Sequence, residues 1–99
     1  MKNTMLQQEK LEMGASMLRA MAHPMRVAII ELLTATKRLS VTEIYEKLSI
    51  EQPSASHHLN ILKSKGVLDS KREGKKIFYS LKHEKVKEII SSMDRCLEM

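Results

Sequence analysis

This chain of 99 residues is poor in several residue types. It has one cysteine, no tryptophan, three glycines and two prolines, and aromatic residues make up 3% of it. The one cysteine, Cys96, cannot close a disulfide within the chain, which is typical of proteins in reducing compartments. With so few aromatic residues, a core must be built from aliphatic side chains and from methionine, of which there are eight.

Long apolar runs are also missing. No stretch approaches the ~18 residues that a membrane-spanning helix needs, and residues 1–10 contain no apolar segment of the kind found in signal peptides. We therefore expect a cytoplasmic protein with no membrane partner. A chain of this length makes one domain, and because so small a domain buries a limited core, association with a second copy would add stability.

Catalytic motifs are scarce. Ser54 or Ser56 beside His57 could suggest a nucleophile and a base. No acid is placed to orient the histidine, the chain has no glycine-rich phosphate loop, and its length leaves little room for a substrate cleft. We therefore expect no enzymatic activity and no cofactor.

Positive charge is present and concentrated. The formal net charge is +5, and six lysines and arginines against two acids fall between His57 and Lys76, so this fifth of the chain carries a net charge of +4. A solvated basic face would explain such a cluster. A cluster that coincides with a DNA-binding motif, however, is typical of proteins with a polyanionic partner.

The segment from Gln52 to Lys63 holds that motif. Ala55, Leu59 and Leu62 recur at helical spacing and predict a helix with one apolar face. Its polar residues can then meet the edges or backbone of base pairs. His58 has two interpretations, a phosphate contact or a packing role, and both stay open. The DNA-binding residues predicted in this helix are Gln52, Ser54, Ser56, His57, His58, Asn60 and Lys63.

Five helices and one hairpin can be placed in the whole chain from periodicity, caps and turns. Ser40 and Glu43 form a capping box, Pro24 suits the first turn of a helix, Gly66 ends one, and residues 36–39 read as a loop. The predicted helices are Thr4–Met21, Pro24–Ala35, Val41–Leu48, Gln52–Lys65 and His83–Leu97. The predicted strands are Val67–Arg72 and Lys76–Leu81.

This order predicts an α+β, mostly helical winged helix-turn-helix fold (ααααββα) in a single domain over residues 1–99. Residues 41–66 form the helix-turn-helix and residues 67–82 the β-wing, where Lys71, Arg72, Lys75 and Lys76 are expected to contact DNA phosphates or the minor groove. The first and last helices, within residues 1–22 and 83–99, carry more apolar surface than the rest of the domain can cover. We expect them to dimerise about a two-fold axis.

The residues and their order together resemble the ArsR/SmtB family of bacterial winged-helix repressors. The resemblance covers roughly residues 15 to 90, and its motifs are specific as a set. The segments that carry it are Met21-Ala22-His23-Pro24-Met25-Arg26, Ser56-His57-His58-Leu59, Leu62-Lys63-Ser64-Lys65-Gly66-Val67-Leu68 and Arg72-Glu73-Gly74-Lys75-Lys76-Ile77-Phe78-Tyr79-Ser80-Leu81. It implies a homodimeric transcriptional regulator that binds a palindromic double-stranded DNA operator, usually represses, and leaves the DNA when an inducer arrives.

The sequence departs from the metal-sensing members of that family. Arsenite and cadmium sensors carry a cysteine pair in or beside the third helix, where this chain has no thiol. Zinc sensors use four ligands across the last helices of the dimer, and the corresponding positions here are His83, Lys85, Cys96 and Met99. Lysine is a cation and methionine a poor zinc ligand, so only His83 and Cys96 remain as metal candidates, and we expect no complete metal site.

Three alternative interpretations remain. A repressor could respond to a metal or to oxidants through His83 and Cys96, with Cys96 pairing across the dimer. Methionines at every fourth position, Met13 to Met25, could bind Cu(I), although such a stripe is more typical of core packing. A winged-helix scaffold without DNA binding is the third, but it would not need a basic wing. The effector, if there is one, is not identified by the sequence.

Overall fold

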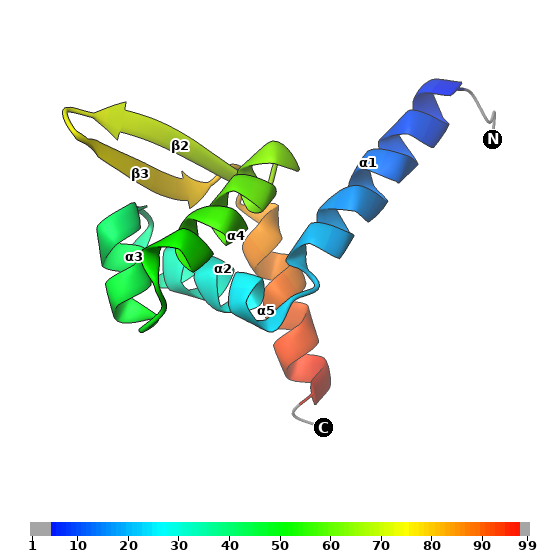
Figure 1. Ribbon diagram of the computed structural model, residues 1–99. Helices are drawn as coiled ribbons and strands as arrows, with labels where there is room; N and C mark the ends of the chain where they lie inside the picture. Colours follow the sequence, from blue (N-terminus) through cyan, green and yellow to red (C-terminus); the bar gives the residue numbers. More distant parts are fainter. Residues whose placement is uncertain (1–4, 98–99) are drawn as a thin grey trace.

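The computed structural model describes residues 5–97, which form a winged helix-turn-helix (Figure 1). The predicted fold class is confirmed, and the helix and strand limits agree with prediction to within two residues among the residues described; Thr4 lies outside them. The elements in chain order are α1 (Met5–Met21), α2 (Pro24–Thr36), β1 (Leu39–Ser40), α3 (Val41–Lys47), α4 (Gln52–Ser64), β2 (Leu68–Glu73), β3 (Lys76–Leu81) and α5 (Lys85–Leu97).

The sheet has a third strand that the sequence did not predict. Residues 36–39 were expected to form a loop, but Leu39 and Ser40 pair antiparallel with Tyr79 and Phe78 and give the strand order β1-β3-β2. A two-residue strand is too short to show an alternating pattern, and its partner lies about forty residues further along the chain. Because Leu39 is buried, β1 fixes the start of α3 against the root of the wing.

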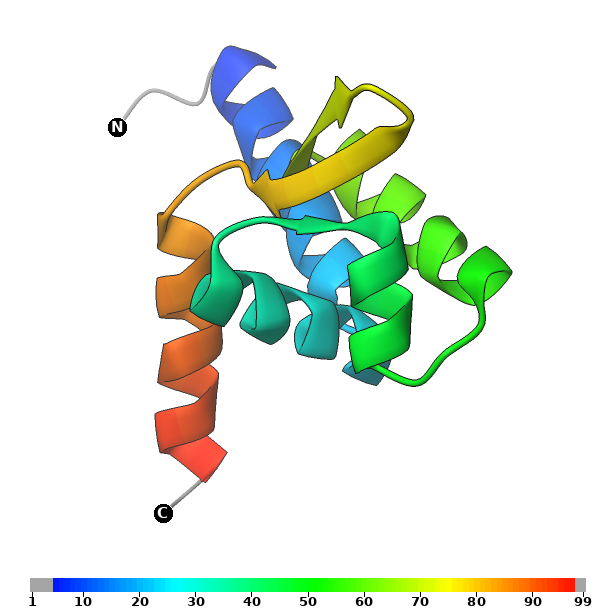
Figure 2. The same ribbon diagram turned by 90° about the vertical axis from the view of Figure 1, so that its left-hand side faces the viewer.

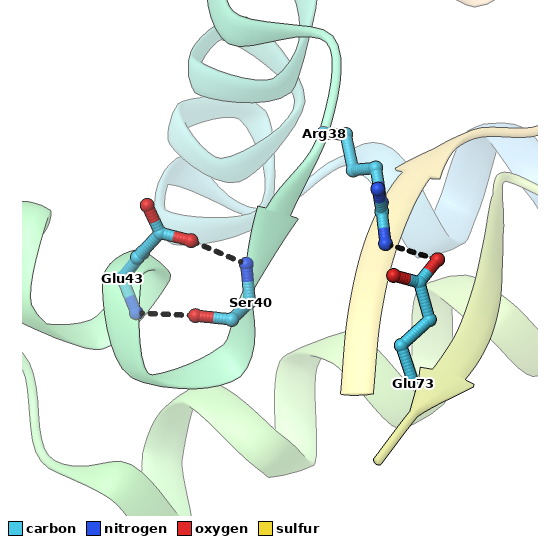
Figure 3. A network of polar contacts seen from close by, with 4 residues as sticks. All are labelled: Arg38, Ser40, Glu43 and Glu73. Atoms are coloured by element: carbon cyan, nitrogen blue, oxygen red, sulfur yellow. Dashed lines mark hydrogen bonds and ion pairs between the residues drawn. The ribbon is translucent and has the colours of Figure 1, made fainter. Parts of the chain in front are cut away.

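Local hydrogen bonds explain where several helices begin and end. The capping box at α3 is present: the Ser40 hydroxyl accepts from the Glu43 N–H at 3.2 Å, and the Ser40 N–H donates to Glu43 Oε1 at 3.0 Å (Figure 3). At α2, His23 Nδ1 accepts from the Met25 N–H at 3.1 Å. Gly66 has φ +80°, as expected of a residue that ends α4 in a left-handed conformation.

The core is aliphatic, as the shortage of aromatic residues requires. The central helix α2 contributes Ile29, Ile30 and Leu33, each at most 1% exposed. The buried side chains of α3, α4 and β2 surround it, so the helix-turn-helix and the wing share one core. These are Ile44, Leu59, Leu62 and Leu68, together with Val67.

Helices α1 and α5 leave apolar surface open. In Figure 1, α1 extends away from the body in a different direction from the wing, and Figure 2 shows α5 along one side of the molecule. A groove of about 450 Å³ between the two helices is lined mostly by apolar residues, among them Leu18, Met21, Val86 and Ile89. No helix within residues 5–97 combines the length and the apolar character that crossing a bilayer requires.

Candidate nucleic-acid interface

Helix α4 has one buried and one exposed face, in the arrangement that the spacing predicted. Ala55, Leu59 and Leu62 are fully buried. Of the predicted DNA-binding residues on this helix, Ser56 is half-buried and the exposed ones are Gln52, Ser54, His57, Asn60 and Lys63. A row of short polar and basic side chains on a helix anchored from behind is suited to entering the major groove of DNA.

His58 does not belong to the exposed face. It is 8% exposed, and its Nδ1 accepts a hydrogen bond from Arg26 Nε at 3.2 Å. Its ring lies 4.8 Å from that of His23 and 5.6 Å from that of His57, measured between centroids. Burial lowers the pKa of His58 from its ordinary 6.5, and the nearby charges of His23, Arg26 and His57 lower it further. Of the two roles considered from the sequence, the geometry supports packing rather than phosphate contact.

The wing carries its cations on both faces. Lys71 is paired with Phe78 and Glu73 with Lys76, so these four side chains share one face of the hairpin. Arg72 lies on the opposite face, where its Nε donates to the Gly74 carbonyl at 3.2 Å in the turn. The four predicted phosphate-binding residues, Lys71, Arg72, Lys75 and Lys76, are all exposed.

Arg38, the residue before β1, contacts two side chains of the wing. The Arg38 guanidinium lies 4.0 Å from the centroid of the Phe78 ring and forms an ion pair with Glu73 (Figure 3). Hydrogen bonding from Arg38 lowers the pKa of Glu73. The sequence analysis missed Arg38 because its partners lie 35 and 40 residues away. Such an exposed pair contributes little stability, but it adds a cation beside the wing.

Helix α4, the recognition helix of this winged helix-turn-helix, faces the wing across a shallow hollow. Gln52 and Ser56 line it from α4, and Lys75 and Lys76 line it from the wing. Thr42, in the first turn of α3, is a further lining residue that sequence reasoning did not select, because a lone threonine in a helix carries no DNA-binding pattern. The hollow therefore combines groups that can read bases with cations that can hold phosphates.

The two metal candidates are not close to one another. His83 precedes α5, whereas Cys96 is in its last turn and is exposed. At about 1.5 Å of rise per residue, the helix between them separates the two side chains by about 15 Å or more. Within residues 5–97, no three side chains of the types His, Cys, Asp and Glu gather in a way that could hold a metal ion. Met99 lies outside the described residues. Any site using His83 and Cys96 would need ligands from two chains.

Known proteins with the same fold and related sequence are regulators of transcription. Residues 21–71 match a family described as a helix-turn-helix domain. An HTH-type transcriptional regulator of Methanocaldococcus jannaschii is 40% identical over 86 residues, which cover 87% of this chain and 97% of that protein. The HTH-type transcriptional repressor SmtB of Mycobacterium tuberculosis is 40% identical over 73 residues, 74% of this chain and 53% of that protein.

The similarity extends to a solved structure. The transcriptional repressor PagR of Bacillus anthracis is 40% identical over 84 residues, which cover 85% of this chain and 84% of that protein. Its crystal structure superposes with a TM-score of 0.79 over 87% of this chain and 98% of that chain. The aligned regions include both the exposed helix and the wing, since they span most of the chain.

Proposed function

Because this chain belongs to the ArsR/SmtB family of winged helix-turn-helix transcriptional regulators, we propose that it binds a palindromic operator as a homodimer and represses transcription there. The family consists of DNA-binding regulators and not of enzymes, in agreement with the expectation from the sequence. The observation that carries the proposal is the hollow where Gln52 and Ser56 face Lys75 and Lys76. Repression follows from the similarity to proteins that are named repressors.

Readout of bases is assigned to the exposed first turns of α4. A glutamine can pair bidentately with adenine in the major groove, so Gln52 is the best candidate for a base contact. Ser54, Ser56 and His57 extend the same surface along the helix. Asn60 and Lys63, further toward its end, are proposed to contact the DNA backbone.

Positioning on the DNA is assigned to the wing. Its lysines and arginine are exposed, and cations on a hairpin beside a recognition helix can contact phosphates or enter the minor groove. Such contacts release counterions and hold the protein in register without distinguishing sequences. The wing residues in this role are Lys71, Arg72, Lys75 and Lys76.

Dimerisation is assigned to α1 and α5, within residues 1–22 and 83–99. Leu11, Leu18 and Leu97 are 71%, 53% and 81% exposed, and Ile89 and Met93 are more than a third exposed. A single chain that leaves such a surface open is stabilised when a second copy covers it. Two-fold symmetry would then place two α4 helices in successive major grooves, about 34 Å apart.

The inducing signal is proposed to be something other than Zn(II), Cd(II) or As(III). The chain has no thiol pair near α3, and of its two remaining ligand candidates His83 precedes α5 and Cys96 lies in the last turn of that helix. A non-metal effector would act by favouring one of two dimer geometries, since a ligand that binds both equally shifts nothing. We place this regulation in the cytoplasm, where a bacterial-type regulator meets its DNA.

The test is selection of an operator from random duplex DNA, followed by affinity titrations at several salt concentrations. We expect a sequence with two inverted half-sites, two chains bound per duplex, and an affinity that falls steeply as salt rises. If the protein binds DNA but no preferred sequence can be selected, the proposal of a specific operator is wrong. An absence of binding to DNA and heparin alike would favour the scaffold interpretation.

A second set of titrations adds metals, oxidants and polysulfide to the operator complex. We expect Zn(II), at about one equivalent per chain, to leave the affinity unchanged. A loss of affinity that His83→Ala or Cys96→Ser abolishes would overturn this part of the proposal. It would show that the two residues are completed into a site by the partner subunit.

A further inference from the structure

One polar cluster in the structure is not used by the proposed DNA contacts. It joins three parts of the molecule: the end of α1, the first turn of α2, and the buried side of α4. Arg26 of α2 donates from Nη1 to the Ala20 carbonyl of α1 at 3.1 Å, and from Nε to His58 Nδ1 of α4 at 3.2 Å. Arg26 is therefore hydrogen-bonded at once to the proposed dimerisation helix and to the recognition helix.

The protonation state of His58 follows from this geometry. Arginine has only N–H donors, so the nitrogen that receives Arg26 Nε must carry a lone pair. His58 is then a neutral imidazole with its proton on Nε2. A second proton, on Nδ1, would remove the acceptor and place two cations in contact in a buried position, where repulsion is weakly screened.

We propose that Arg26 and His58 are positioning residues that fix the recognition helix relative to α1, and that operator binding requires His58 to be neutral. This inference rests on the proposed function, because the spacing of the two α4 helices in a dimer matters only if both must enter the grooves of one operator. In a dimer built on α1 and α5, a contact that ties α4 to α1 sets that spacing.

Acid should therefore weaken operator binding. The charged and titratable groups that act on the His58 ring are His23 at the α1–α2 corner, Arg26 of α2, and His57 of α4 itself; no carboxylate is among them. Each adds to the cost of a charge on His58. The pKa of His58 in the folded chain lies below 6.5, so the stabilising contact is complete above pH 6.5 and is lost as pH falls through that lower pKa.

The direction of the change in DNA affinity distinguishes protonation of His58 from protonation of an exposed histidine. A proton gained by an exposed histidine near the DNA adds positive charge and strengthens binding to phosphates. Loss of affinity on acidification is thus the signature expected of the buried ring.

The experiment compares four variants with the wild-type chain on the selected operator, between pH 5 and pH 8. His58→Asn retains an acceptor near the Nδ1 position but does not titrate. His58→Leu and Arg26→Lys each break the link between Arg26 and His58. His23→Asn is the control that keeps the Arg26–His58 hydrogen bond and, because asparagine is also a good N-cap, the start of α2. It removes one of the groups that oppose a charge on His58.

At pH 7.5 we expect His58→Asn to bind nearly as well as wild type. His58→Leu and Arg26→Lys should bind about tenfold more weakly, which is the effect of one hydrogen bond to a charged group on an equilibrium constant. On acidification, wild type and His23→Asn should lose affinity and His58→Asn should not. Equal affinities for wild type, His58→Leu and Arg26→Lys would overturn the positioning role. An acid loss that His58→Asn retains would overturn the requirement for a neutral ring.

Thermal unfolding without DNA separates this inference from the proposed function. If wild type binds no operator at all, the proposed function fails, but the link can still be measured in the free protein. We expect acid to lower the melting temperature of wild type more than that of His58→Asn. The same pH dependence for both would overturn the assignment even if DNA binding is confirmed.

Discussion

Leu33 represents the residues whose role is to fill the core. It is 1% exposed and lies among the buried side chains of α2. Leu33→Ala leaves a cavity and should lower the free energy of unfolding by about 2–5 kcal/mol. Urea unfolding at a fixed protein concentration measures this, since a dimer unfolds in a concentration-dependent way.

The matched control for that substitution is Glu31→Ala, on the exposed side of the same helix. Its effect should stay within about 0.5 kcal/mol, the usual range for a surface change. If the two substitutions lower the free energy of unfolding by the same amount, Leu33 is not the core residue that its burial indicates.

Gln52 represents the residues that would read the DNA sequence. Gln52→Ala should lower discrimination at one base pair of each half-site by about 1–3 kcal/mol, because a bidentate contact to adenine is lost. The dependence of affinity on salt should change little, because no phosphate contact is removed. Competition among operators that differ at single positions measures both quantities. A uniform loss of affinity across all sequences would mean that Gln52 positions the protein on the DNA and does not read a base.

Residues with periodic neighbours could be predicted from the sequence, and residues whose partners are distant could not. Ala55, Leu59 and Leu62 were placed correctly because a helix repeats every 3.6 residues. The polar neighbour His58 could not be assigned to packing, because its hydrogen bond comes from Arg26, 32 positions earlier. Arg38 was missed for the same reason.

At the scale of elements, α3 is seven residues long and depends on its cap. Ser40→Ala removes the acceptor for the Glu43 N–H and should lower the free energy of unfolding by about 1 kcal/mol. Glu43→Gln keeps a side-chain acceptor for the Ser40 N–H and should cost less. Chemical unfolding at pH 7.5 compares them, and equal losses would mean that the charge of Glu43, rather than the cap geometry, matters.

The same box predicts a pH dependence. Hydrogen bonds from the backbone and side chain of Ser40 lower the pKa of Glu43 from 4.5. A lowered pKa means that the stabilising contact is complete above pH 4.5 and is lost as pH falls through the folded value. Glu43→Gln should therefore be less sensitive to acid than wild type in this range.

The wing is the element that should govern the electrostatic part of DNA binding. Lys75→Ala with Lys76→Ala removes two cations from its tip and should weaken binding to every sequence. The slope of log affinity against log salt should become less steep by about 2. Lys85→Ala with Lys87→Ala makes the same change of charge on α5 and should leave that slope nearly unaltered. Equal salt slopes for the two double variants would mean that the wing does not contact the DNA.

Long or capped elements were the ones that the sequence predicted well. Each helix has either an apolar stripe or a cap at its start, and the hairpin has a glycine at its turn. Strand β1 has none of these signals, because it exists only through its pairing with β3. The start of α5 was set two residues early, at His83, which precedes the helix without forming part of it.

At the scale of the whole molecule, the open faces of α1 and α5 predict the assembly state. Wild type should have twice the chain mass of 11.4 kDa at micromolar concentration. Leu18→Glu with Ile89→Glu places charge in the apolar groove between these helices and should yield monomers that bind the full operator weakly. Sedimentation measures the mass. Thr36→Glu, at the exposed end of α2, is the control and should remain dimeric. A wild-type monomer would refute the dimer and, with it, two-fold operator binding.

In the strand order β1-β3-β2, the six-residue strand β2 forms one edge of the sheet and the two-residue strand β1 forms the other. Free edges present unpaired N–H and C=O groups that can recruit strands from other molecules. After its buried first residue, Leu68, this strand reads Asp69, Ser70, Lys71, Arg72 and Glu73, with no apolar side chain that would reward such pairing. The charges proposed to hold DNA would also protect the protein from aggregation when no DNA is bound. Replacing these charged residues with apolar ones would then make the protein aggregate before any effect on gene regulation could be seen.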